Sequence, residues 1–295
     1  MAIDLHMHST ESDGELTPEE LVRIGKELGL IAMAVSDHDS YEGARRARIA
    51  GERIGMKVIM AAEISTSFEG KTLHVLTYGV DIDNPELRVT IDDLKKYRFD
   101  RAKSILGDIN RELASGGEKT VDTEPIMALN REKPITRGDI AEELVRQGFV
   151  ADKNEAFARW LVKYDRPNRS ITVGDVARLA HGAGGVAVLA HPNSPYLSLN
   201  TLSPDFVEHE RILTKFKTDG LDGIEVYHPD HSPEASEKYL DLARRLGLIA
   251  TAGSDFHSAT QGIGPTALGQ YTGPDWIVAE LETAIEKYRK SRTTA

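Results

Sequence analysis

Seven short apolar runs, separated by segments with helical patterns, most restrict the fold of this 295-residue chain. We predict buried strands at residues 3–5, 31–35, 58–62, 73–78, 186–190, 223–226 and 248–252. Thr17-Pro18-Glu19-Glu20 and Ser232-Pro233-Glu234 are typical of helix starts, because an N-cap residue precedes a proline in each. Apolar strands that alternate with helices predict a mainly parallel α/β sheet, open or closed into a barrel.

Residues 85–170 interrupt this alternation with helical patterns at 94–113, 137–147 and 154–162 and no convincing strand. Here 17 Lys and Arg slightly exceed 16 Asp and Glu, whereas the whole chain has a net charge of −11. We therefore predict a core of residues 1–84 and 171–295, with residues 85–170 as a helical insertion, or cap. Its basic residues would be available to an anionic substrate.

Composition excludes several kinds of protein and of site. The chain has no cysteine, so disulfides, thiolate metal sites and cysteine nucleophiles are impossible. No apolar stretch could span a bilayer and the N-terminus lacks a signal-peptide pattern, so we expect a cytoplasmic protein without a membrane partner. The acidic net charge argues against binding to duplex DNA. It leaves room for a small phosphorylated substrate, because bound metal ions reverse the local field.

Histidine and carboxylate side chains gather where the predicted strands end, with Glu63 taken as the end of the third. Because the carboxyl ends of parallel strands lie on one side of a sheet, we expect residues remote in sequence to meet there. The expected cluster is His6, His8, His38, His74, His191, His257, Asp13, Glu63 and Asp255. It is too rich for one ion and suits two or three manganese, iron(II) or zinc ions better than magnesium or calcium. The alternative is six unrelated buried histidines, each hydrogen-bonded separately, which would cost several kcal/mol.

Together these motifs resemble the polymerase and histidinol phosphatase (PHP) family of metal-dependent phosphoesterases. The matching segments are Asp4-Leu5-His6-Met7-His8-Ser9, Asp13-Gly14, Asp37-His38-Asp39, Glu63, His74, Ala190-His191-Pro192 and Gly253-Ser254-Asp255-Phe256-His257. The resemblance implies a distorted (β/α)7 TIM-like barrel. It also implies three metal sites. The first would be held by His6, His8, Glu63 and Asp255. Glu63 would bridge to a second ion held by His74 and His191, and a third ion would be held by Asp13, His38 and His257. Mn²⁺ is the first expectation, with Fe²⁺ or Zn²⁺ as alternatives.

Within the family, the insertion and the segment Ile135-Thr136-Arg137-Gly138-Asp139 resemble members that act on nucleotide phosphates. The resemblance implies hydrolysis of 3′,5′-nucleoside bisphosphates, or 5′-to-3′ degradation of short single-stranded RNA. Residues matching Arg137 and His231 contact phosphate in that branch, and we expect Arg166 and His228 to join them in binding the substrate. Structural alternatives remain, since Arg166 could simply pair with Asp165 and a histidine before a helix could simply pack.

The expected reaction is attack of a metal-bridging hydroxide on phosphorus, with Glu63, His191 and Asp255 as the catalytic residues. His191 or a metal-bound water would protonate the leaving group, and Asp37 and Asp39 would orient the ligands. Three alternatives stay open. The first is a cyclic phosphodiesterase or general sugar phosphatase, and the second is an amide hydrolase, whose metals a carboxylated lysine often bridges where this chain has Glu63. The third is a non-catalytic module.

Overall fold

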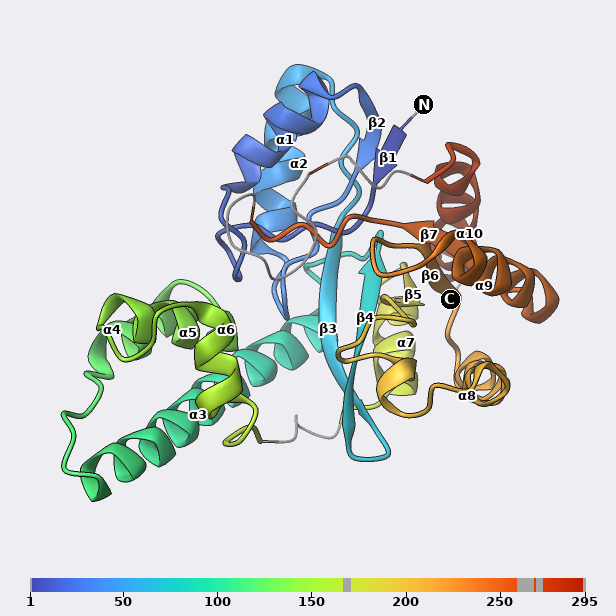
Figure 1. The fold of residues 1–295 in the computed structure, drawn as a ribbon. Coiled ribbons are helices and arrows are strands. Elements are labelled where there is room, and N and C mark those ends of the chain that lie inside the picture. Colours follow the sequence, from blue (N-terminus) through green and yellow to red (C-terminus); the bar gives the residue numbers. More distant parts are fainter. Residues whose placement is uncertain (1, 167–170, 259–267, 269–272, 294–295) are drawn as a thin grey trace.

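The computed structural model describes residues 2–166, 171–258, 268 and 273–293, which form a mixed α/β fold (Figure 1). Its strands lie close to the predicted apolar runs. They are β1 (Ala2–Asp4), β2 (Leu30–Met33), β3 (Ala61–Phe68), β4 (Lys71–Tyr78), β5 (Val186–Leu189), β6 (Gly223–Tyr227) and β7 (Ile249–Ala252).

The strands form two sheets, β1-β2 and β3-β4-β5-β6-β7. The β1-β2, β5-β6 and β6-β7 pairs are parallel, but β4 runs antiparallel to both β3 and β5. The expectation of parallel strands is therefore wrong for β4. The physical reason is the two-residue turn Glu69-Gly70, whose φ angles of 49° and 75° suit a tight hairpin, whereas a parallel connection needs a longer crossover.

The third strand also lies later in the chain than predicted. It begins at Ala61 and continues to Phe68, while Val58 makes only an isolated bridge with Met33. Glu63 therefore lies inside β3 rather than at its end. In the hairpin Ser65 pairs with His74 and Glu63 with Leu76, which puts Glu63 and His74 on one face as diagonal neighbours.

Isolated bridges join the two sheets at their edges. Met33 bridges Val58, His38 bridges Glu63, and Met7 bridges Phe256, all in parallel. The bridges bring the segments that follow β1 and β2 beside β7 and β3. Since the described strands are divided between two sheets, the closed seven-stranded barrel stays a prediction.

Apolar side chains cover both faces of the central strands. In β5, Val186 and Val188 belong to one hydrophobic cluster, whereas Ala187 and Leu189 belong to another, as expected for a strand buried on both faces. The cluster around Val186 and Val188 also contains Ile3 and Leu5, and helix α10 (Trp276–Thr293) closes it. The segment that carries His6 and His8 therefore leaves directly from an apolar core.

The remaining helices include both predicted starts, whereas α3 (Pro85–Ser115) begins nine residues before the helical pattern predicted at 94–113. They are α1 (Pro18–Glu27), α2 (Glu42–Ile54), α3 (Pro85–Ser115), α4 (Glu124–Ala128), η1 (Leu129–Arg131), α5 (Arg137–Arg146), α6 (Lys153–Ala156), η2 (Phe157–Leu161), α7 (Val173–Gly182), η3 (Leu199–Thr201), α8 (Phe206–Thr218) and α9 (Pro233–Leu246). Thr17 and Glu20 form the expected capping box at α1, and Ser232 accepts a hydrogen bond of 3.2 Å from Ala235 N at α9.

The described residues from 85 to 166 contain helices and no strand, and in Figure 1 they stand to one side of the sheet. Residues from Ala102 to Leu161 form a hydrophobic cluster of their own around Trp160. Helix α3 belongs to both parts, because Leu87 and Leu94 pack in the core of the sheet. The predicted boundary at residue 170 lies outside the described residues. No helix in the described part of the chain is long and apolar enough to cross a membrane.

Candidate metal centre

Glu63 lies at the centre of the histidine and carboxylate cluster. Its Oε1 is 2.9 Å from His74 Nδ1 and 3.0 Å from His191 Nε2. Its Oε2 is 2.8 Å from His38 Nδ1 and 3.4 Å from His8 Nε2. One carboxylate, buried to 1% exposure, thus touches imidazoles from four separate segments of the chain.

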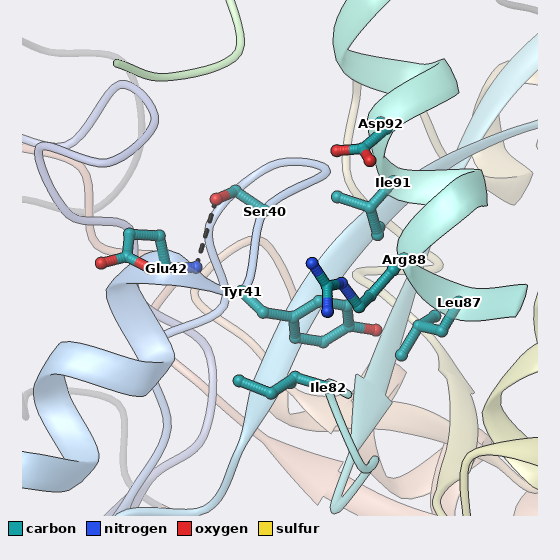
Figure 2. A pocket seen from close by; sticks show the side chains of 8 residues that line it. All are labelled: Ser40, Tyr41, Glu42, Ile82, Leu87, Arg88, Ile91 and Asp92. Carbon is teal, nitrogen blue, oxygen red and sulfur yellow. Dashed lines mark hydrogen bonds between the residues drawn. The ribbon is translucent and has the colours of Figure 1, made fainter. Parts of the chain in front are cut away.

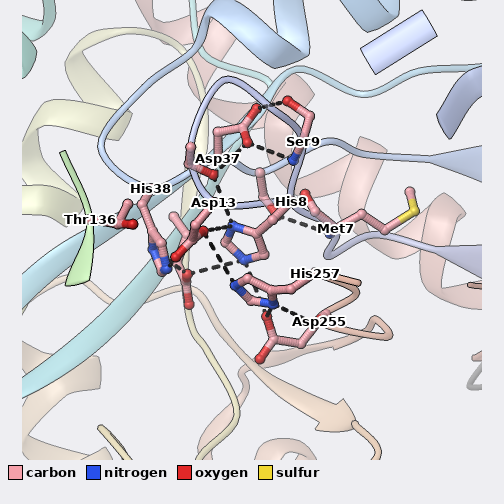
Figure 3. Close-up of polar contacts among 12 residues, drawn as sticks. Met7, His8, Ser9, Asp13, Asp37, His38, Thr136, Asp255 and His257 are labelled. Atoms are coloured by element: carbon pink, nitrogen blue, oxygen red, sulfur yellow. Dashed lines mark hydrogen bonds and ion pairs between the residues drawn. The ribbon is translucent and has the colours of Figure 1, made fainter. Parts of the chain in front are cut away.

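A second group forms around Asp13 (Figure 3). Asp13 Oδ1 lies 3.5 Å from His257 Nε2, 3.8 Å from His38 Nε2 and 3.9 Å from His8 Nδ1. The rings of His8 and His257 stack with their centroids 4.0 Å apart. Asp255 Oδ1 completes the contact, at 3.2 Å from His8 Nε2.

All nine residues predicted for the cluster therefore meet in space. Three overlapping groups have ligand atoms close enough to share an ion. The groups are His8, Asp13, His38 and His257; His6, His8 and Glu63; and His38, Glu63 and His74. Because His8, His38 and Glu63 each belong to two groups, the geometry is that of adjoining sites rather than three separate ones.

The unsatisfied atoms of the cluster fit a metal ion. Asp13 Oδ1, His38 Nδ1, Glu63 Oε2 and His191 Nδ1 are buried without a hydrogen-bond partner among the described residues. His38 Nδ1 and Glu63 Oε2 are close, yet their orientation makes no hydrogen bond. Orphaned buried polar atoms are costly, and oxygen and imidazole donors that converge in this way are what a divalent transition metal binds.

Burial and neighbouring charges shift the pKa values of the imidazoles in both directions. Although burial opposes it, Asp13 and Glu63 raise the pKa of His38 to about 9. Burial, with the neighbouring His257 and His38, lowers the pKa of His8 to about 3. Burial also lowers the pKa of His74 to about 4. Both rings are therefore neutral at pH 7, which is the form that binds a metal. Although burial alone would raise it, the adjacent imidazoles hold the pKa of Glu63 well below its usual range.

Glu225 of β6 orients the cluster from behind, and the sequence analysis missed it. Its carboxylate accepts a hydrogen bond of 3.1 Å from His6 Nδ1 and one of 2.9 Å from the backbone N of His191. Nε2 of His6 is thereby left to face Glu63 and Asp255, each at 3.4 Å. Such a carboxylate behind a ligand histidine fixes its tautomer and orientation. A single charged residue in an otherwise apolar strand was the available signal.

Asp37 and Asp39 hold the loops around the cluster. Asp37 accepts hydrogen bonds from Ser9 N at 2.8 Å and Ser12 Oγ at 2.6 Å, both in the segment that leads directly to Asp13. Asp39 Oδ2 binds Arg98 Nε of α3 at 2.5 Å. The buried Arg98, which the sequence analysis also missed, thus fastens α3 to the loop beside His38.

Backbone strain is concentrated at this site. Asp39, His191 and Asp255 have positive φ angles of 49°, 28° and 50°. Residues with a Cβ adopt such angles at a cost of about 1–3 kcal/mol each. Two of the three belong to the expected ligand set, so the fold holds these side chains in place against local preference.

Helix α5 begins directly beside Asp13. Thr136 caps it, and Figure 3 shows Thr136 next to the Asp13 group. A Cβ placed on Gly138 would lie 3.2 Å from Asp13 Oδ2, so the first turn of α5 packs closely against this carboxylate. Arg137, the residue before, belongs to the same first turn, and its Nη1 is 2.9 Å from Asp165 Oδ2.

The other predicted substrate-binding residues differ in placement. The guanidinium of Arg166 pairs with Asp108 of α3 rather than with Asp165, and among the described residues it has no contact with the nine-residue cluster. His231 uses both ring nitrogens on backbone groups, Val226 O at 2.8 Å and Asn193 N at 3.2 Å. It therefore braces the loop after β5.

His228 is aimed into the cluster. Its Nδ1 accepts a hydrogen bond of 3.1 Å from Asp230 N, so the proton is on Nε2. That buried Nε2 has no hydrogen-bond partner among the described residues, and it lies 3.5 Å from Asp255 Oδ2. His228 is thus a donor at the edge of the nine-residue cluster.

A cavity of about 220 Å³ lies elsewhere, between the start of α2 and the first turns of α3 (Figure 2). Tyr41, Leu87 and Arg88 are among its lining residues, and none of the nine cluster residues is. It is separate from the candidate metal centre.

Comparison with known proteins identifies what the chain is similar to. The model of the PHP domain family matches residues 4–162. The chain is 31% identical to the 3′,5′-nucleoside bisphosphate phosphatase of Chromobacterium violaceum, over 96% of this chain and 97% of that protein. It is 30% identical to the 5′-3′ exoribonuclease Rnm of Escherichia coli, over 99% and 95%. A solved structure from Bifidobacterium adolescentis, assigned as a metal-dependent phosphoesterase, has 30% identity and a TM-score of 0.81 over 96% of each chain.

Proposed function

Because the chain belongs to the PHP family of metal-dependent phosphoesterases, we propose that it removes the 3′-phosphate of 3′,5′-nucleoside bisphosphates. One observation carries the choice of substrate. The first turn of α5 packs against Asp13 of the cluster and brings Arg137 beside it. A substrate with two phosphates would then place one on the metal centre and the other on Arg137.

In this proposal all nine residues of the cluster are metal ligands, with Glu63 as the bridging carboxylate. When bound, divalent ions would neutralise charge on the phosphate and lower the pKa of water towards neutrality. We assign Glu63, His191 and Asp255 to catalysis. The edge bridges between the two sheets also support the proposed seven-stranded barrel, with the cluster at its mouth.

The histidines around the cluster divide the remaining tasks. His228 Nε2 donates a hydrogen bond to a non-bridging phosphate oxygen. His191 Nδ1, or water, gives a proton to the leaving oxygen. His231 holds the loop that carries His191, and it would reach phosphate only by releasing Asn193.

The arginines are assigned to the second phosphate. Arg137 binds it, and Arg166 joins only by leaving Asp108. The insertion of residues 85–170, proposed as a separate cap domain, would then serve to hold the phosphate that is not cleaved.

A second candidate is 5′-to-3′ degradation of short RNA, which the similarity to the Rnm exoribonuclease over nearly the whole chain favours. A 5′-phosphorylated oligonucleotide presents two neighbouring phosphates as well. A cyclic phosphodiester or sugar phosphate with a single phosphate would offer Arg137 no second phosphate to bind. An amide hydrolase of the carboxylated-lysine kind is disfavoured, because Glu63 occupies the bridging position.

The test is phosphate release by the purified protein loaded in turn with Mn²⁺, Fe²⁺ and Zn²⁺. We expect kcat/KM for adenosine 3′,5′-bisphosphate to exceed that for adenosine 3′-phosphate by about 10-fold or more, since one charge-assisted contact is lost. A cyclic phosphate, glucose 6-phosphate and a 5′-phosphorylated trinucleotide serve as competing substrates. If the protein prefers the cyclic phosphate or glucose 6-phosphate, the proposal is overturned. If it prefers the trinucleotide, 5′-to-3′ degradation of short RNA is favoured instead.

A further inference from the structure

The guanidinium of Arg137 does not stand alone. Asp165 bridges two arginines with one carboxylate: its Oδ2 lies 2.9 Å from Arg137 Nη1, and its Oδ1 lies 3.1 Å from Arg101 Nε of α3. A second nitrogen of Arg101 also donates to Oδ1. Each carboxylate oxygen therefore serves a different arginine. Neither the sequence motifs nor the family resemblance assigned a role to Arg101.

The two arginines are largely buried, and one carboxylate serves both. Arg101 is 10% exposed and Arg137 is 21% exposed, whereas Asp165 is the most accessible of the three at 30%. The two guanidinium groups share the single carboxylate of Asp165. Burial, together with the nearby Arg101 and Arg98, lowers the pKa of Arg137, although Asp165 opposes this effect. A group with two negative charges would satisfy the pair better than Asp165 does.

Asp165 is also placed where its side chain can rotate away from the two arginines. It belongs to a short connection after η2, and its own backbone neighbour, Arg166 N, donates to Oδ1 at 2.9 Å. Just before it, Tyr164 and Lys163 are tied to Glu112 of α3. Rotation of one side chain would therefore free the two arginines, while the chain on either side of Asp165 stays attached to α3.

We propose that Arg101 and Arg137 together form the subsite for the phosphate that is not cleaved, and that Asp165 occupies this subsite as an internal anion until substrate displaces it. The inference rests on the proposed function and deepens it. Asp165 makes the subsite selective, because only a ligand with more negative charge than a carboxylate gains by exchange. A phosphate monoester dianion meets this condition, and an uncharged nucleoside does not.

The experiment is isothermal titration calorimetry of the metal-loaded protein with adenosine 5′-phosphate, and with adenosine as the uncharged reference. We expect Asp165→Asn to tighten binding of adenosine 5′-phosphate by about 5–10-fold, because the competing charge is removed, and Arg101→Ala to weaken it by about 10-fold. Neither variant should change binding of adenosine.

Two matched controls separate exchange from a general change of charge. Glu142→Gln removes one negative charge from the same helical segment, where Glu142 pairs with Lys153 at 3.1 Å. Arg88→Ala removes one positive charge from α3, at the cavity of Figure 2. Both should leave the affinity for adenosine 5′-phosphate within about 2-fold, because exposed charges at a distance are screened.

The inference is overturned if Asp165→Asn binds adenosine 5′-phosphate no more tightly than the unchanged protein, or if Glu142→Gln tightens it equally. If circular dichroism shows that Asp165→Asn is unfolded, Asp165→Ser is read by the same criteria. Failure of the inference is distinct from failure of the proposed function, since the unchanged protein would still release phosphate from the bisphosphate. Conversely, calorimetry tests the subsite even if another substrate proves to be the one hydrolysed.

Discussion

The metal cluster and the arginine group of the helical segment handle buried charge in opposite ways. In the cluster, Asp13, His38 and Glu63 each keep an atom without a hydrogen-bond partner in the described structure. In the arginine group, Arg101 and Arg137 are bridged by Asp165, and Arg166 is paired with Asp108. In the proposed function, the first region would bind metal ions directly. The second would exchange an internal partner for a phosphate of the substrate.

This difference predicts how each region responds when one of its side chains is removed. Removal of a ligand from the cluster leaves buried charges without compensation, and the chemistry depends on them directly. Removal of an arginine weakens only the grip on a distant phosphate, because its acidic partner can turn to solvent. The following predictions test that ranking from the largest expected effect to the smallest.

The largest effect is expected for His8→Ala. His8 belongs to two of the three candidate metal groups, so its loss should lower kcat by about 1000-fold or more, together with bound metal. Turnover with excess Mn²⁺ and metal analysis of the purified variant are the measurements. His181→Gln, at the far end of α7, is the control and should keep its metal. A His8→Ala protein that is fully active would remove the cluster from the mechanism.

A smaller loss is expected for Glu225→Gln. The amide can still accept from His6 or from the His191 backbone but loses the negative charge that orients them. Loss of a carboxylate behind a metal ligand typically costs about 10–100-fold in metal affinity or activity. Titration of activity against Mn²⁺ measures it. An unchanged Mn²⁺ dependence would mean that Glu225 only fills the core.

Arg137→Ala should separate the two regions. We expect KM for adenosine 3′,5′-bisphosphate to rise by about 10-fold, with little change for adenosine 3′-phosphate and none in metal content. Steady-state kinetics with both substrates gives the comparison. Equal effects on the two substrates would show that Arg137 does not bind the second phosphate.

The smallest effect is expected for Thr136→Ala at the start of α5. Loss of the cap costs about 1 kcal/mol of stability, and it loosens the turn that packs on Asp13. The midpoint temperature of thermal unfolding should fall by a few degrees, while the variant keeps its bound metal. Thr17→Ala, which removes the corresponding cap of α1, is the matched control for stability alone. A loss of metal in Thr136→Ala would mean that the two regions are not separable.

The cluster was predictable because its signals are local. Motifs such as His6-Met7-His8 mark strand ends, and the convergence of those ends follows from sheet geometry. The predicted direction of β4 was wrong, yet His74 still contacts Glu63. It does so across the hairpin rather than from a neighbouring parallel strand. The Glu69-Gly70 turn was the missed signal.

The contacts of the helical segment were not predictable in the same way. Arg98, Arg101 and Arg166 lie in polar helical or turn sequence, where most arginines are solvated. Their partners Asp39, Asp165 and Asp108 are set by tertiary packing. Spacing along the chain carries no trace of such pairs, and the prediction for Arg166 accordingly named the neighbouring Asp165 as its alternative partner.

Helix α3 runs for 31 residues through both regions without a proline beyond its first turn. Arg98 is fixed to Asp39 in the sheet half, and Arg101, one turn later, reaches towards Asp165. Three residues advance an α-helix by about 4.5 Å, so a rigid helix would set the separation between the candidate metal centre and the proposed phosphate subsite. The protein would then select a substrate by the distance between its two phosphates, and no lid would have to close.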